Sequence, residues 1–122
     1  MKTNILKEKS FRFSIRMVNF YHFLIKIHKE YVISKQFLRC STSVAAQIYE
    51  AEFGQSKPDF VHKLSLSQKE KNETMYWLEL LFRIHNIDEK MYTSLNEDAK
   101  EILKLITASI NTVKRKTKFN DH

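Results

Sequence analysis

Glycine, proline and cysteine each occur only once in the 122 residues. A β-rich fold needs turn-forming residues at many corners, so their scarcity argues against a sandwich or barrel and favours long helices joined by short loops. A lone cysteine cannot form an intramolecular disulfide. Cys40 lies in an amphipathic segment, where a free cysteine is usually a small buried residue, and we expect it to be buried rather than reactive.

Several motifs that would indicate a membrane, a metal or a nucleotide are also missing. No uncharged stretch approaches the ~20 residues that a membrane span needs, and Lys7, Glu8 and Lys9 interrupt any early signal-like apolar run. None of the five histidines stands three or four residues from another, and one glycine cannot build a phosphate-binding loop. We therefore expect a cytoplasmic protein that is not an enzyme, with no metal and no cofactor.

Hydrophobic periodicity and capping residues predict four helices in a single domain, residues 1–122. The predicted ranges are about 7–29, 35–53, 57–85 and 95–117. Ser34 and Ser56 are expected N-caps, and the segment Ser94-Leu95-Asn96-Glu97 has the pattern of a capping box. Gly54 suits the left-handed position that ends a helix. Four long helices with short connections predict an all-α, up-down-up-down antiparallel four-helix bundle.

The first helix is apolar on too many sides for one bundle core. In the second helix, Phe37, Val44, Ile48 and Ala51 keep to a single face. In the first, apolar residues between positions 11 and 27 cover most of the circumference, whereas a helix that faces solvent needs only about a 100° apolar stripe. We therefore predict that the protein is a homo-oligomer that buries a second face of this helix.

Positive charge is concentrated at the two ends of the chain. Residues 1–40 hold nine Lys or Arg against two Asp or Glu, and residues 111–122 hold four against one, whereas residues 41–110 are slightly acidic. In an up-down bundle the first helix begins where the fourth ends, so the two basic segments should converge on one end. The cations of this predicted basic end are Lys7, Lys9, Arg12, Arg16, Lys114, Arg115, Lys116 and Lys118. The acidic residues Asp88, Glu89, Glu97, Asp98 and Glu101 should gather at the opposite end.

Two interpretations of the basic end stand side by side. It is either a solvated surface that complements a helix dipole or a phosphate-binding surface for RNA or DNA. Phe11 and Phe13 alternate with Arg12 in a way that suits stacking on unpaired bases, although oligomer contacts would use the same aromatics equally well.

Polar residues in the middle of the second and third helices form a second candidate site. An antiparallel pairing would place Glu70 and Glu73 opposite Arg39, Ser41 and Ser43. No nucleophile–base pair is evident among them, so we interpret the group as a buried polar layer that fixes helix register rather than as an active site. A weak hydrolase that uses these carboxylates is a distant alternative.

Several runs together resemble the bacterial four-helix bundle proteins encoded in intervening sequences of 23S ribosomal RNA genes. The matching runs lie between about Ser10 and Ile110 and comprise Ser10-Phe11, Ser34 to Val44, Ile48 to Ala51, Ser56 to Phe60, Lys63-Leu64, Lys69-Glu70 and Glu73 to Leu78. Where relatives often have Gly and Asn, this chain has Ala45 and Gln47, which puts in doubt the close helix contact that the Gly permits.

The resemblance implies an up-down bundle that assembles into a ring, typically a pentamer. Some relatives, the accessory variability determinants of diversity-generating retroelements, form similar rings that bind a reverse transcriptase and nucleic acid. The resemblance brings no catalytic residues. Two functions thus remain open: a non-catalytic oligomer that binds RNA or DNA through its basic end, and a protein-interaction scaffold without a nucleic-acid role.

Overall fold

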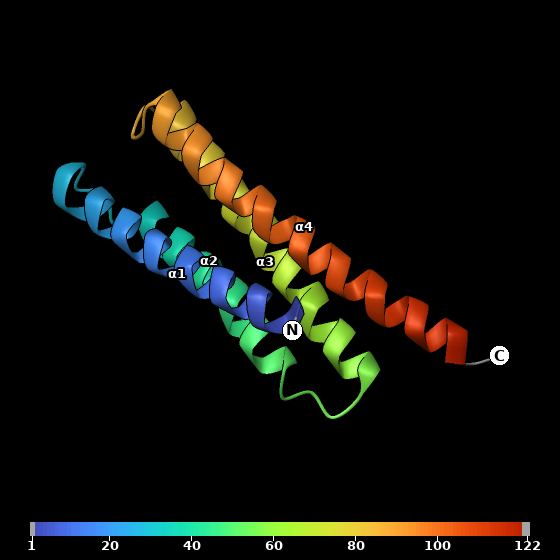
Figure 1. The fold of residues 1–122 in the computed structure, drawn as a ribbon. Helices are drawn as coiled ribbons and strands as arrows, with labels where there is room; N and C mark the ends of the chain where they lie inside the picture. The colour runs from blue at the N-terminus through green and yellow to red at the C-terminus, as the bar shows by residue number, and fades with distance from the viewer. Residues whose placement is uncertain (1, 121–122) are drawn as a thin grey trace.

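The computed structural model describes the backbone of residues 2–120 and the side chains of residues 5–116. Within this part of the chain there are four helices and no strand: α1 (Lys2–Ile27), α2 (Ile33–Ala51), α3 (Lys57–Arg83) and α4 (Glu89–Asn120). Each helix packs against the next, and α4 returns against α1 (Figure 1). The predicted all-α, up-down-up-down four-helix bundle is confirmed. The α2–α3 interface is the most extensive and the α1–α4 interface the least.

The core follows the predicted helical spacing. Phe37, Val44, Ile48 and Ala51 are all buried on α2. Phe37 is fully buried, and its ring meets that of Phe20 from α1 edge to face, with 5.3 Å between centroids. The other helices contribute Leu24, Leu64, Leu78, Leu81, Ile102 and Ile106 to the same cluster. Burial of these side chains supplies most of the free energy that holds the four helices together.

Three of the predicted helix starts are wrong: α1 begins at Lys2 instead of about residue 7, and acidic side chains instead of serines cap α2 and α4. At α2, the Glu30 carboxylate accepts hydrogen bonds from the backbone N–H groups of Val32, Ile33 and Ser34, at 3.2, 2.9 and 2.7 Å. At α4, Asp88 Oδ1 accepts from the Met91 N–H at 2.8 Å, so the helix begins at Glu89, six residues earlier than expected. Asp and Ser satisfy a helix N-terminus about equally well, so composition alone does not choose between them.

The α2–α3 loop confirms one predicted cap and corrects the other. Ser56 accepts a hydrogen bond from the Asp59 N–H at 3.2 Å and caps α3, as expected. Gly54 does not have a positive φ, so it is not a left-handed helix end. Its role is close packing, because a Cβ there would lie 3.1 Å from the Ala51 carbonyl oxygen and 3.2 Å from Asp59 Oδ2. The left-handed positions are at Lys29 (φ 55°) and His85 (φ 66°), just beyond α1 and α3.

A second face of α1 stays apolar and exposed in the single chain. Phe13, Met17 and Leu24 point into the core, whereas Phe11 and Ile15 are each more than half exposed. Phe11 and Ile15 lie four residues apart on the outer face, and the half-buried Val18 follows three residues later. Within the described part of the chain, this face of α1 is left uncovered at Phe11 and Ile15.

Candidate nucleic-acid interface

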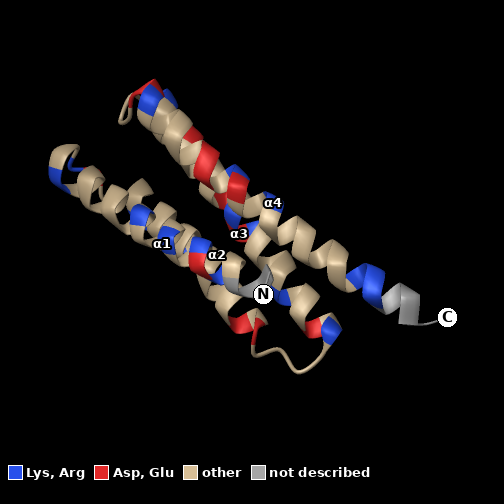
Figure 2. Ribbon diagram, in the orientation of Figure 1, with Lys and Arg blue, Asp and Glu red and all other residues tan. Residues whose placement is uncertain are grey.

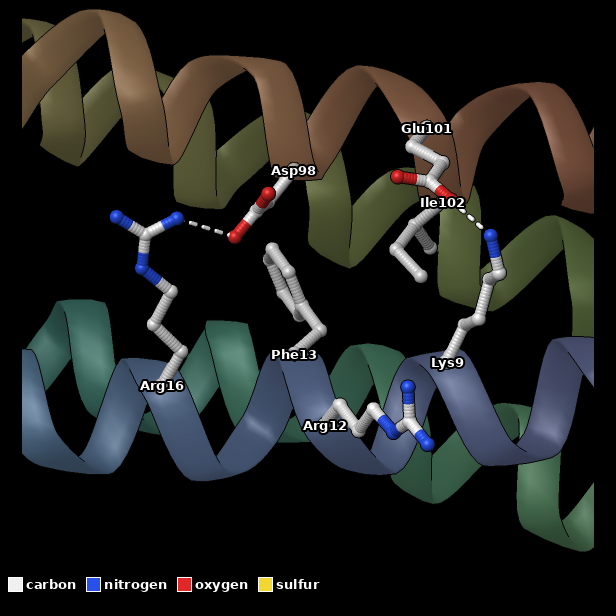
Figure 3. Close-up of a pocket in the computed structure, with 7 residues that line it drawn as sticks. All are labelled: Lys9, Arg12, Phe13, Arg16, Asp98, Glu101 and Ile102. Atoms are coloured by element: carbon white, nitrogen blue, oxygen red, sulfur yellow. Dashed lines mark hydrogen bonds and ion pairs between the residues drawn. The ribbon is translucent and has the colours of Figure 1, made fainter.

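Two of the predicted phosphate-binding cations lie on the face of α1 that meets α4. Lys9 and Arg16 stand four residues before and three residues after Phe13, which is buried in the core, so they flank it on one helical face. Lys9 pairs with Glu101 of α4. Arg16 pairs with Asp98 and also donates to the Ser94 side-chain oxygen at 2.6 Å. Both cations therefore link α1 to α4 (Figure 3).

These residues line a groove of about 380 Å³ between α1 and α4. Phe13 and Ile102 supply its apolar lining, and Lys9, Arg12, Arg16, Asp98 and Glu101 its charged lining (Figure 3). The two carboxylates come from α4 and the three cations from α1, so the charges on the two sides of the groove largely cancel. These seven residues form the α1–α4 groove.

Lys7 and Arg12, the other two α1 cations, are held differently. Lys7 Nζ lies 3.1 Å from Oε2 of Glu52, the residue after α2, and 4.8 Å from the centre of the Tyr49 ring of α2. Arg12 pairs only with Glu8 in its own helix, at 3.4 Å, and its side chain is 75% exposed. Because exposed pairs one turn apart contribute only about 0.3–0.5 kcal/mol, Arg12 is the most available to an incoming anion of the four predicted phosphate-binding cations of α1.

The basic C-terminal turns of α4 lie apart from these α1 cations. Lys114, Arg115 and Lys116 are exposed, and none of the ion pairs among the described side chains involves them. Figure 2 shows them on the part of α4 that extends toward the C-terminus. The Lys118 side chain lies outside the described residues.

The predicted convergence of the two basic segments is wrong in its register. Lys9 contacts Glu101, so Lys114 stands further along α4 by about 20 Å of helix rise. The acidic set also divides, since Asp98 and Glu101 face α1 instead of lying at the far end with Asp88. The sequence alone did not show this pairing, because it joins residues more than 80 positions apart.

A further cation, which sequence reasoning missed, joins the end of α4. The Gln68 amide donates to Thr107 Oγ1 at 3.1 Å, which sets the register of α3 against α4. With that register, the exposed Lys57 in the first turn of α3 lies level with the last turns of α4. Lys57, Lys114, Arg115 and Lys116 are called the α4 basic end below. Lys57 could have been identified from the sequence, because it lies in the first turn of α3 and α3 runs antiparallel to α4.

The predicted polar layer forms only in part, and it is not buried at Arg39. Arg39 pairs with Glu73 at 2.5 Å and approaches Glu70 at 3.8 Å, as predicted, but its side chain is 53% exposed. Ser41 is buried and donates to the Leu38 carbonyl of its own helix at 3.3 Å. Among the described hydrogen bonds, none joins Ser41 or Ser43 to this ion pair. The Trp77 indole N–H, which donates to Glu73 at 3.1 Å, completes the surface network instead.

Substituting Arg39 with Ala should therefore change stability only slightly. An exposed ion pair contributes up to about 1 kcal/mol, whereas a buried one costs ~3–5 kcal/mol when one partner is removed. We expect the free energy of unfolding of Arg39→Ala, measured by urea denaturation, to fall by less than about 1 kcal/mol. A loss of ~3 kcal/mol or more would show instead that Arg39 forms a buried ion pair with Glu73 and Glu70, because removing one partner of a buried pair leaves the other charge uncompensated.

Further buried polar groups lie on the core-facing stripe of α3, where Ser67 and Thr74 repeat at helical spacing with Leu64 and Leu78. Ser67 donates to the Val44 carbonyl at 2.7 Å, across the α2–α3 interface. Thr74 Oγ1 lies 2.8 Å from the Glu70 carbonyl and 3.4 Å from Cys40 Sγ. Lys71 is also buried, and desolvation lowers its pKa. Its spacing from Leu64, Ser67 and Thr74 places it on the core stripe, which was the available signal.

Cys40 is fully buried, as predicted, and should be inert in the folded protein. Burial raises the pKa of its thiol from 9.0 to about 11. At pH 8 the thiolate fraction is then about a hundredfold lower than in the unfolded chain, and the thiolate is the reactive species. We expect a thiol-specific disulfide reagent to label the native protein at least about a hundredfold more slowly than the protein in denaturant. Equal rates would show that Cys40 is exposed.

The remaining chemistry of the described residues is sparse. No group of three or more His, Cys, Asp or Glu in that part of the chain is placed to hold a metal ion. None of the described helices is both long enough and apolar enough to cross a membrane.

Comparison with known proteins places the chain in a family. Residues 2–108 match the family model of the 23S rRNA-intervening sequence protein. The chain belongs to the 23S rRNA-intervening sequence protein family. The predicted resemblance to this family is thereby confirmed. No protein with a curated description matches the chain.

A solved relative of this intervening sequence protein shares its whole architecture. It is a protein of unknown function from the S23 ribosomal protein family of Bacteroides thetaiotaomicron VPI-5482. The two chains are 50% identical and superpose with a TM-score of 0.89, over 91% of this chain and 99% of the relative. The match extends the family assignment to the three-dimensional arrangement of the helices.

Proposed function

We propose that this member of the family is a non-catalytic homo-oligomer that binds single-stranded RNA or DNA through the α4 basic end. The proposal rests on which positively charged side chains have carboxylate partners in the structure and which do not. Lys7, Lys9 and Arg16 of α1 pair with carboxylates from other parts of the bundle, whereas Lys114, Arg115 and Lys116 are three consecutive exposed cations without an ion pair among the described side chains. Other exposed lysines, such as Lys35 and Lys69, also lack a described ion pair, but this end has three such cations in succession and so concentrates unpaired positive charge for a partner.

Phosphates are the partner that such a surface suits best. Lysine and arginine side chains on the last turns of a helix can each approach a backbone phosphate, and every contact releases a counterion. The described residues at this end include no element that resembles a groove-reading motif. Binding should therefore depend on the sugar-phosphate backbone of the nucleic acid and show little base preference. Assembly would place several such ends on one ring and multiply the local charge.

The test is a salt titration with the wild-type protein. We expect the logarithm of the association constant for a single-stranded oligonucleotide to fall linearly with the logarithm of salt concentration, with a slope of about −0.7 for each phosphate neutralised. RNA and DNA of different sequence should bind within a few-fold of each other. If no salt-sensitive binding is found at low ionic strength, the protein-interaction scaffold becomes the better explanation.

Oligomerisation rests on the outer face of α1 and is tested separately. We expect light scattering of the wild type to give a multiple of the 14.6 kDa chain mass, with five copies as the expected number. Substituting Phe11 and Ile15 with Glu should give a folded monomer, because both side chains are exposed in the single chain and charges would prevent their burial between copies.

A matched control substitutes two exposed aromatic residues outside α1, one in the turn after α2 and one on α3. Phe53→Glu and Tyr76→Glu change charge and apolar surface to the same degree but lie outside α1. Their double variant should keep the wild-type mass. A wild type that is already monomeric at micromolar concentration would contradict the oligomer.

A further inference from the structure

We propose that the α1–α4 groove is a second binding site for a phosphodiester chain, and that Asp98 and Glu101 restrain it by occupying its cations. The inference presupposes the proposed nucleic-acid binding but concerns a different surface from the α4 basic end. It rests on the pairing of Lys9 with Glu101 and of Arg16 with Asp98, and on the exposed guanidinium of Arg12 in the same groove (Figure 3).

The groove holds the groups that a nucleic-acid strand uses. Three cations lie along two turns of α1, and Phe13 and Ile102 line the space between the helices. Arg and Lys bind phosphates, and because Phe13 and Ile102 are buried in the core, a strand over the groove would contact it through the cations rather than by base stacking. The two α4 carboxylates are the reason that this groove presents little net charge in the free protein.

Exchange of a carboxylate for a phosphate is feasible because these pairs are exposed. The side chains of Lys9 and Glu101 are 44% and 52% exposed, and those of Arg16 and Asp98 are 36% and 40% exposed. An ion pair of this exposure contributes at most about fivefold to an equilibrium constant. A strand can therefore displace both carboxylates at modest cost, and each displacement lowers its affinity by up to that factor.

The two carboxylates are not equivalent, and this difference gives the sharpest test. Lys9 has Glu101 as its only described ion-pair partner, so Glu101→Gln removes the one negative charge that holds the ammonium group. Arg16 also donates to the side-chain oxygen and the backbone carbonyl of Ser94, at 2.6 and 3.3 Å. Asp98→Asn therefore leaves Arg16 partly held. If only the net charge of the protein mattered, Glu101→Gln and Asp98→Asn would change the affinity by the same amount.

The experiment measures binding of a fluorescent oligo-dT of about 20 nucleotides at low salt, with Glu97→Gln as the matched control. Glu97 lies on α4 and is 65% exposed, and it pairs only with Lys100 of its own helix, at 3.9 Å. We expect Glu101→Gln to raise affinity by up to about fivefold, Asp98→Asn by less, and Glu97→Gln least of all. Adding Lys9→Gln to Glu101→Gln should cancel the gain.

To separate this inference from the proposed function, the same variants are also measured in a background in which the α4 basic end is reversed in charge by substitution with Glu. If wild type binds but Glu101→Gln gains no more than Glu97→Gln in either background, the groove is not a site and the α4 basic end stands alone. If only Glu101→Gln binds, and reversal of the α4 basic end leaves that binding unchanged, the groove is the site and the proposed function fails. Thermal melts of each variant verify that the bundle is intact.

Discussion

Reversing Lys114, Arg115 and Lys116 to Glu should lower affinity for single-stranded nucleic acid by at least about a hundredfold at low salt. Three attractive contacts become three repulsive ones, and like charges placed against each other across an interface cost several kcal/mol. If each residue meets one phosphate, the residual salt dependence should also be less steep by about two units of slope. The fold should survive, because all three side chains are exposed.

The control is a second triple variant that changes the net charge by the same six units elsewhere on the bundle. Lys35, Lys69 and Lys104 are exposed residues of α2, α3 and α4 that take part in none of the described ion pairs. Their reversal to Glu should weaken binding far less, since exposed charges more than about 10 Å from the strand are screened at moderate salt. Equal losses in the two triple variants would mean that net charge alone governs binding and would remove the α4 basic end as a site.

Substituting Phe37 with Ala should destabilise the bundle more than any surface change. The side chain has no exposed area and packs against the Phe20 ring, so its removal leaves a cavity between α1 and α2. Such substitutions cost about 3–5 kcal/mol, a large part of the 5–15 kcal/mol that stabilises a typical domain. The melting temperature should fall by about 10–20 °C.

Urea denaturation followed by circular dichroism, at a single protein concentration, measures the Phe37 effect, because assembly makes stability concentration-dependent. Phe53→Ala is the matched control, since that ring is 66% exposed and its loss should cost less than about 0.5 kcal/mol. A change below about 1 kcal/mol at Phe37 would show that the α1–α2 interface closes over the missing ring without a cavity.

The sequence predicts the fold well because the core pattern is local. The spacing from Phe37 to Val44 and Ile48 identifies one buried face without any knowledge of the neighbouring helices. Helix starts were harder to predict, because Ser94 and Asp88 both qualify as caps. The structure uses Asp88, and Ser94 lies inside α4, where its side chain accepts from Arg16. Only the packing of α4 against α1 distinguishes these two roles.

The site was less predictable than the fold because it depends on register between distant helices. Topology placed the start of α1 and the end of α4 on one side, but not which residues meet across the interface. A shift of a few residues decides whether Lys9 faces Glu101 or solvent. Burial of Arg39 was likewise misjudged, because helical position alone does not show how far a long side chain reaches toward water.

Lys71 links the folding of this bundle to proton release. Burial lowers the pKa of its amine below the ordinary 10.5 that it has in the unfolded chain. Between the lowered value and 10.5, the folded protein holds this proton less tightly than the unfolded chain does. The contribution of Lys71 to stability therefore rises with pH across that interval, and below it the bundle folds around a charged amine at full desolvation cost. A neutral apolar side chain of similar length at this position would remove both the cost and its pH dependence.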